Sequence, residues 1–160
     1  MNILITGIGG PTPRSIAKQL RSLFPKAYIV GTDIHSKALG FFMENLLDKT
    51  VVIPRADHPD YFEVINDIVK AEKIDFAFIQ PEKEVQAWGD YYNDKGHYPC
   101  QTLIPPVEHV NVLMDKAAMA DLFSDTDFIP ETIRITPQKP RFEEVSQRIG
   151  YPCWIRASIG

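Results

Sequence analysis

The chain has 160 residues, of which 44% are hydrophobic and 24% are charged, and its formal net charge is -4. These proportions are typical of a folded globular protein and exclude a disordered chain. The negative charge disfavours a nucleic-acid partner, because such binding depends on neutralising phosphates with lysine and arginine. No apolar run is long enough to span a bilayer, and no charged leader precedes the first apolar run. We therefore expect a cytoplasmic protein with a small-molecule ligand and no membrane partner.

The first hundred residues alternate short apolar runs with helical patterns. The runs typical of buried strands cover residues 2–6, 28–32, 51–53, 76–79 and 102–104. Apolar residues recur at helical spacing after the first run and again between residues 61 and 69. Because neighbouring parallel strands need a crossover about as long as a helix, the alternation predicts an α/β fold. We expect a Rossmann-like, doubly wound parallel sheet over residues 1–106.

The pattern changes after two consecutive prolines at 105 and 106. Asp115 is well placed to cap a helix, and we expect a linker helix over residues 107–124. Its inner face would be formed by Met119, Leu122 and Phe123. Residues 131–135 and 153–155 have the composition of strands, and residues 141–149 that of a short helix. These elements are too few to close a core, so we expect residues 125–160 to be the start of an incomplete second domain.

A glycine-rich turn follows the first predicted strand, with glycines at Gly7, Gly9 and Gly10. Glycines at this place let a phosphate approach the N-terminus of a helix. Asp33 follows the second strand 24 residues after Gly9, near the offset of an acid that binds ribose in dinucleotide-binding proteins. The fingerprint is incomplete, because Thr12 stands where the third glycine would be and two prolines remove amide donors. The turn fits either an NAD(P)-binding oxidoreductase or a tight turn without a ligand.

Two acidic residues, Glu82 and Glu84, follow the fourth predicted strand at the same edge of the sheet. A carboxylate pair at this place could face an amine-bearing substrate. The same residues could simply begin the next helix, where negative charge suits the helix dipole. The four histidines show no metal-ligand spacing, and no serine or cysteine has a visible base partner. The sequence therefore predicts no metal site in these residues and identifies no catalytic residue.

The order of motifs along the whole chain resembles the ATP-grasp superfamily, and within it the proteins similar to the large subunit of carbamoyl-phosphate synthase. The similar stretches are GTDIHSKALGFF, DKTVVIPRADHPDYFEVINDIVKAEKIDFAFIQPEKEV and YPCWIRAS. The last resembles the family's strand with the pattern Tyr/Phe-Pro-x-x-x-Arg-Pro-Ser, although Ala157 replaces the proline that relatives often have. These enzymes carry a Rossmann-like domain in front of the ATP-grasp domain, in agreement with the predicted fold.

The resemblance implies an ATP-dependent ligase that activates a carboxylate or bicarbonate as an acyl phosphate for attack by an amine. Lys116, Arg156 and Ser158 would contact the phosphates of ATP. The ligands of Mg²⁺ would lie beyond residue 160, so residues 1–160 would be inactive alone. The substrate would meet the edge of the first domain formed by the glycine turn, Asp33 and the two glutamates. Two alternatives stay open, an NAD(P)-binding oxidoreductase and a non-catalytic regulatory module, and so does a homodimer.

Overall fold

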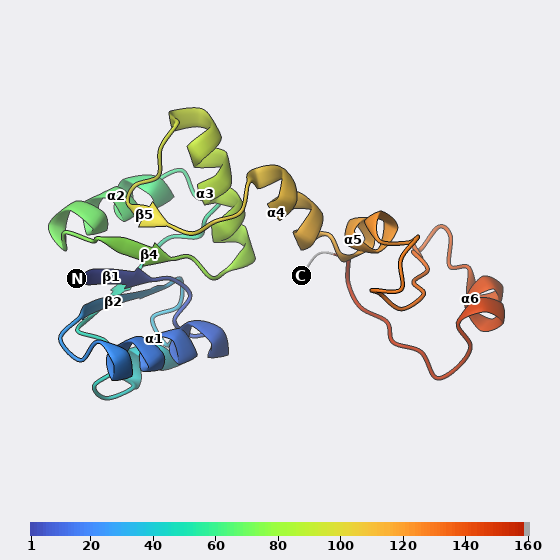
Figure 1. The fold of residues 1–160 in the computed structure, drawn as a ribbon, viewed down its shortest axis with the longest axis horizontal. Coiled ribbons are helices and arrows are strands. Elements are labelled where there is room, and N and C mark those ends of the chain that lie inside the picture. Colours follow the sequence, from blue (N-terminus) through green and yellow to red (C-terminus); the bar gives the residue numbers. More distant parts are fainter. Residues whose placement is uncertain (159–160) are drawn as a thin grey trace. The chain divides into compact units, whose positions relative to one another are not determined.

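A computed structural model describes residues 1–158 (Figure 1). The chain divides into two compact units, Met1–Val107 and Glu108–Gly160. The first unit contains a β-sheet with helices, and the second contains short helices joined by irregular segments. Within the described residues, every helix is too short or too polar to cross a membrane.

The first unit is organised around a five-stranded parallel sheet. Its strands are β1 (Asn2–Ile5), β2 (Tyr28–Asp33), β3 (Lys49–Val52), β4 (Phe76–Phe78) and β5 (Gln101–Thr102). The strand order is β3-β2-β1-β4-β5, and each neighbouring pair is parallel. The chain therefore runs outward from β1 to β3 and then returns to the other side of β1. The predicted Rossmann-like sheet is confirmed, and its strand order reverses between β1 and β4, where ligands bind in such folds.

Helices cover both faces of this sheet. They are α1 (Pro11–Leu23), α2 (Tyr61–Ala71) and α3 (Glu82–Lys95), with a short 3-10 helix, η1 (Leu39–Phe42), after β2. Figure 1 shows α1 on one face and α2 with α3 on the other. Ile3 and Ile5 pack with Ala17 of α1, whereas Leu4 packs in the opposite core with Trp88 of α3. The strands are continuously apolar because alternate side chains enter two cores.

The second unit contains α5 (Lys116–Leu122) and α6 (Phe142–Arg148), and α4 (Val107–Met114) begins at the boundary between the units. The Asp115 carboxylate accepts the N–H groups of Ala117 and Ala118, so the predicted cap is confirmed. This cap also starts a new helix, so the single linker helix predicted over residues 107–124 is wrong. The predicted inner face is wrong at Leu122, which is exposed.

Residues 131–135 and 153–155, both predicted as strands, form no strand with any residue that the structure describes. Trp154 is 100% exposed and Ile155 is 77% exposed, so these apolar residues enter no core within the described part of the chain. A strand exists only when a neighbouring strand satisfies its backbone groups. The bridge in this unit joins Thr136 and Lys139 instead. Apolar composition was therefore insufficient to predict a strand, because neither segment has a pairing partner among residues 1–158.

Candidate functional site

The glycine turn and Asp33 meet at the carboxyl edge of the sheet, as the strand order requires. Asp33 Oδ2 accepts the N–H of Gly9 at 2.8 Å, and Asp33 Oδ1 accepts the N–H of His35 at 2.9 Å. The Asp33 residue is 8% exposed. The carboxylate thus connects the loop after β1 with the loop after β2. The sequence placed both features at one edge but did not reveal that they bind each other.

The glycines of this turn are required by close packing. Gly7 has a φ of +65°, and a Cβ atom there would lie 2.5 Å from Cγ of Pro81. A Cβ atom on Gly9 would lie 2.9 Å from Oδ2 of Asp33. Both distances are far shorter than normal contacts between non-bonded atoms. The fold alone therefore explains why these two positions carry glycine.

Three amide donors of the turn, from Ile8 to Gly10, are engaged within the protein. Ile8 N–H donates to the Thr32 carbonyl at 3.0 Å, and Gly10 N–H donates to the Gly7 carbonyl at 2.9 Å. Gly9 N–H donates to the Asp33 carboxylate. The next helical positions include two prolines, which have no N–H. A phosphate cradle needs free amide donors, so these three amides would have to leave their partners before they could hold a pyrophosphate.

A surface depression of about 620 Å³ lies beside the turn. Its lining consists of Gly9, Gly10, Asp33, His35, Ser36, Lys37, Ala38 and Leu39. An imidazole, a hydroxyl, an ammonium group and a carboxylate therefore surround one space at the carboxyl edge. The glycines and Asp33 could be predicted from the sequence pattern, whereas the polar residues after β2 were not predicted. The signal that could have found them is their position directly after a parallel strand.

Glu84 lies in the first turn of α3 and is 4% exposed, whereas Glu82 is exposed. The Tyr61 hydroxyl donates to Glu84 Oε2 at 2.6 Å, and Trp88 Nε1 donates to the Tyr61 hydroxyl at 3.1 Å. Burial raises the pKa of the Glu84 carboxyl to about 7, although hydrogen bonds from Tyr61 and Thr6 act in the opposite direction. The two acids predicted as a pair therefore have different environments. Glu84 belongs to a buried polar cluster that the sequence analysis missed.

In the second unit, Lys116 and Ser158 come together although they belong to separate motifs. Lys116 N–H donates to the Ser158 carbonyl at 2.8 Å, and the Ser158 hydroxyl donates to Asp115 Oδ1. The hydrogen bond from Ser158, followed by those of two backbone N–H groups, lowers the pKa of the Asp115 carboxyl. Arg156 is exposed and lies two residues before Ser158. Arg134, which the sequence analysis did not single out, lies 3.7 Å from the Asp115 carboxylate.

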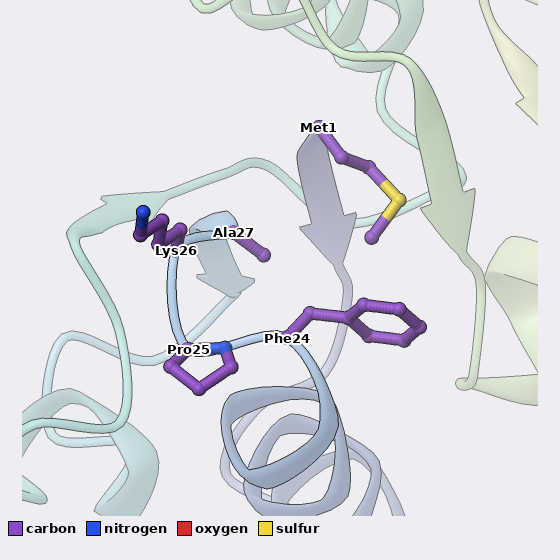
Figure 2. A pocket seen from close by; sticks show the side chains of 5 residues that line it. All are labelled: Met1, Phe24, Pro25, Lys26 and Ala27. Carbon is purple, nitrogen blue, oxygen red and sulfur yellow. The ribbon is translucent and has the colours of Figure 1, made fainter.

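A second depression, of about 390 Å³, lies at the opposite edge of the sheet (Figure 2). Met1, Phe24, Pro25, Lys26 and Ala27 line it. Figure 2 shows the Lys26 side chain pointing away from those of Met1 and Phe24, which leaves an apolar surface. These residues precede β1 and β2, so they lie away from the carboxyl ends of the strands. Among the residues that the structure describes, no three histidine, cysteine, aspartate or glutamate side chains form a candidate metal site.

The parallel sheet and its reversal of strand order define the first unit as a Rossmann-like α/β domain. No model of a known protein family matches the chain, and no curated protein matches it. One similar solved structure is dTDP-glucose 4,6-dehydratase from Bacillus anthracis in complex with NAD, with 14% sequence identity and a TM-score of 0.43. The match covers 88% of this chain and 43% of that protein, so the chain spans less than half of its length. Similarity of this degree carries no information on ligand or reaction.

Proposed function

We propose that the chain is the amino-terminal part of an ATP-dependent ligase of the ATP-grasp superfamily, similar to the large subunit of carbamoyl-phosphate synthase. The complete enzyme activates a carboxylate or bicarbonate as an acyl phosphate, which an amine then attacks. The observation that carries this proposal is the backbone hydrogen bond from the Lys116 N–H to the Ser158 carbonyl at the α5 cap, which brings together two residues that are far apart in the sequence. The resemblance assigns both residues, together with Arg156, to the phosphates of ATP.

The two cations that the resemblance assigns to phosphate lie near this contact, as does the Asp115 carboxylate that accepts the Ser158 hydroxyl. Arg156 is exposed and Lys116 is half-buried, and neither forms an ion pair with a carboxylate among residues 1–158. A guanidinium presents a planar set of donors to phosphate oxygens, and an ammonium group adds a mobile positive charge. Transfer of a phosphoryl group to a carboxylate requires such cations, together with Mg²⁺, to stabilise the developing charge. We expect the Mg²⁺ ligands in sequence that follows residue 160.

The carboxyl edge of the first unit would receive the small substrate in this proposal. The depression beside Gly9 and Asp33 offers a carboxylate and several polar groups. Because the amides of the turn are engaged, this edge is better suited to a small polar substrate than to a pyrophosphate.

A second candidate function is NAD(P) binding at the same edge. The observation in its favour is that Asp33 and the glycine turn line one depression. Asp33 could accept hydrogen bonds from ribose hydroxyls, since each carboxylate oxygen accepts more than one. The pyrophosphate, however, would need Gly9 N–H, which now donates to Asp33. NAD(P) binding would therefore require the turn to change conformation.

The test is calorimetric titration of the full-length gene product with ATP and Mg²⁺, and separately with NADH. We expect Arg156→Ala to weaken ATP binding by about 2 to 3 kcal/mol, because a charge-assisted contact to phosphate is lost. Arg156→Lys should recover part of the loss. The matched control is Arg141→Ala, which removes an exposed arginine of the same unit and should leave ATP affinity unchanged.

Undiminished ATP binding by Arg156→Ala would contradict the ligase proposal, because Arg156 is the residue proposed to bind the phosphates of ATP. NADH binding that is lost in Asp33→Asn would instead favour the second candidate.

A further inference from the structure

A buried polar cluster joins three elements at the carboxyl edge of the first unit. Thr6 follows β1, Tyr61 begins α2, and Glu84 and Trp88 lie one turn apart in α3. Thr6, Tyr61 and Trp88 are almost completely buried, as is Glu84. Packing in the core needs no ionisable group at this place. Each buried polar group in such a cluster must find a partner, so the hydrogen bonds constrain one another.

The hydrogen bonds of the cluster converge on the Glu84 carboxyl. The Tyr61 hydroxyl accepts from Trp88 Nε1 and donates to Glu84 Oε2. Thr6 Oγ1 accepts the N–H of Gln80 at 3.2 Å, and the Thr6 hydroxyl lowers the pKa of Glu84, so it favours the ionised carboxylate. The Tyr61 hydroxyl hydrogen thus points to the carboxyl, and both hydroxyls favour its ionised form. A protonated Glu84 has its own hydrogen to donate, and a hydroxyl that accepts this hydrogen can no longer donate its own to the same oxygen.

The residues that hydrogen-bond in this cluster are adjacent in sequence to residues of the glycine turn and of the loop that packs on it. Thr6 directly precedes Gly7, and Gln80 directly precedes Pro81. Pro81 packs so closely on Gly7 that no Cβ atom would fit between them. The backbone of Thr6 also donates to the Phe78 carbonyl at 3.0 Å. Thr6 therefore contacts both of two loops that lie against each other, so its side chain is placed to influence both.

We propose that Glu84 is a positioning residue of the carboxyl edge, whose protonation sets the conformation of the glycine turn and of the Gln80–Pro81 loop. The ionised carboxylate accepts both hydroxyls and fixes the two loops. The protonated carboxyl releases one hydroxyl and loosens them. The inference concerns the first unit alone and does not depend on which ligand the edge binds.

The charged and titratable surroundings of Glu84 place this change near neutral pH. Burial is the main cause that raises the pKa of Glu84 to about 7, and the nearby Asp33 carboxylate of β2 adds to it. Tyr61 of α2 faces Glu84, and burial raises the Tyr61 pKa far above its ordinary value, so its hydroxyl stays neutral. On α3 itself, the neighbouring Glu82 and Lys83 are exposed.

The experiment uses the full 160-residue chain with Trp154→Phe, which leaves Trp88 as the single tryptophan. The fluorescence of Trp88 and the amide NMR signals of Gly7 and Gly9 are followed between pH 5 and 9. We expect all three signals to change together with one midpoint near 7. Glu84→Gln should abolish this transition and keep the amide signals at their low-pH positions. The matched control is Glu82→Gln, which removes the same charge from the exposed side of the same helical turn and should leave the transition intact.

Tyr61→Phe gives a second readout that a purely structural role would not produce. It removes a hydrogen bond that favours the carboxylate, so the midpoint should move to higher pH. A transition that persists in Glu84→Gln would come from another group and would overturn the proposal. If that variant fails to fold, the ¹³C signal of the Glu84 carboxyl in the parent chain decides. Titration together with the Gly7 and Gly9 amides supports the proposal, and titration without any movement of these amides overturns it.

Discussion

Replacing Glu84 by glutamine should remove a pH-dependent loss of stability. The glutamate pKa is about 7 in the folded chain and 4.5 as its ordinary value, so the folded state binds the proton more tightly than the unfolded state. For an acid with a raised pKa, the free energy of unfolding falls as pH rises from about 4.5 to about 7, and the whole loss is present above pH 7. The loss amounts to about 3 kcal/mol, since one pH unit corresponds to about 1.4 kcal/mol.

Glutamine is neutral at every pH and has nearly the same shape. The free energy of unfolding of Glu84→Gln relative to the parent should therefore rise by about 2 to 3 kcal/mol between pH 5 and pH 8. If glutamine also weakens hydrogen bonds, that loss changes the difference in free energy of unfolding by the same amount at every pH and does not affect its rise with pH. Urea denaturation followed by Trp88 fluorescence measures it, with Glu82→Gln as the exposed control. A difference that stays constant between pH 5 and 8 would refute the reasoning, because the buried carboxyl would then not change its charge in this range.

Two further predictions concern the same edge. Thr32 Oγ1 is buried and has no hydrogen-bond partner among the described residues, so Thr32→Val should stabilise the chain by about 1 kcal/mol. Thr6→Val breaks existing hydrogen bonds and should destabilise the chain by about 1 to 2 kcal/mol. Urea denaturation measures the free energy of unfolding of both variants and shows whether it rises in Thr32→Val and falls in Thr6→Val. Gly7→Ala should cost about 2 to 4 kcal/mol and Gly96→Ala only about 1 kcal/mol, because both have a positive φ but only Gly7 lies against Pro81. Equal losses of thermal stability would show that Pro81 yields without cost.

The sheet could be predicted from sequence because its strands carry an unambiguous signal. Ile3, Leu4 and Ile5 enter two different cores, so the run is apolar without interruption, as buried parallel strands require. The signal is weaker at the edge of the sheet. Residues 51–53 were predicted as a strand, but β3 spans Lys49–Val52, since a polar residue is tolerated where one side of the strand faces solvent.

The strands expected over residues 131–135 and 153–155 could not be established from composition in the same way. Pairing is a property of two segments, and a single segment with β-branched and aromatic residues states only that it would suit a sheet. The segments that contain Ile133 and Ile155 have this composition but no neighbouring strand in the described part of the chain. The sequence therefore predicts a preference, and the structure shows that nothing within residues 1–158 fulfils it.

The different environments of Glu82 and Glu84 follow from helical geometry, which gives a sequence signal that composition alone does not. Residues two apart on a helix point in nearly opposite directions, whereas residues four apart share a face. Glu84 is four residues before Trp88, so both belong to the buried face of α3, and Glu82 does not. Once the helix is placed at Glu82–Lys95, the burial of one acid and the exposure of the other can be predicted. The partners of Glu84 cannot be predicted in this way, because Tyr61 and Thr6 come from other elements.

The hydrogen bond between Gly9 and Asp33 separates the two candidate functions of the carboxyl edge. A phosphate held by the Gly9 N–H would require that group to leave the Asp33 carboxylate, which itself keeps acceptor capacity for ribose hydroxyls. Placing a phosphate at the turn would also bring its negative charge close to that of Asp33. A small polar substrate makes no such demand, since it can bind in the depression while the pair stays closed. The closed pair therefore favours a small polar substrate over a dinucleotide in this conformation of the turn.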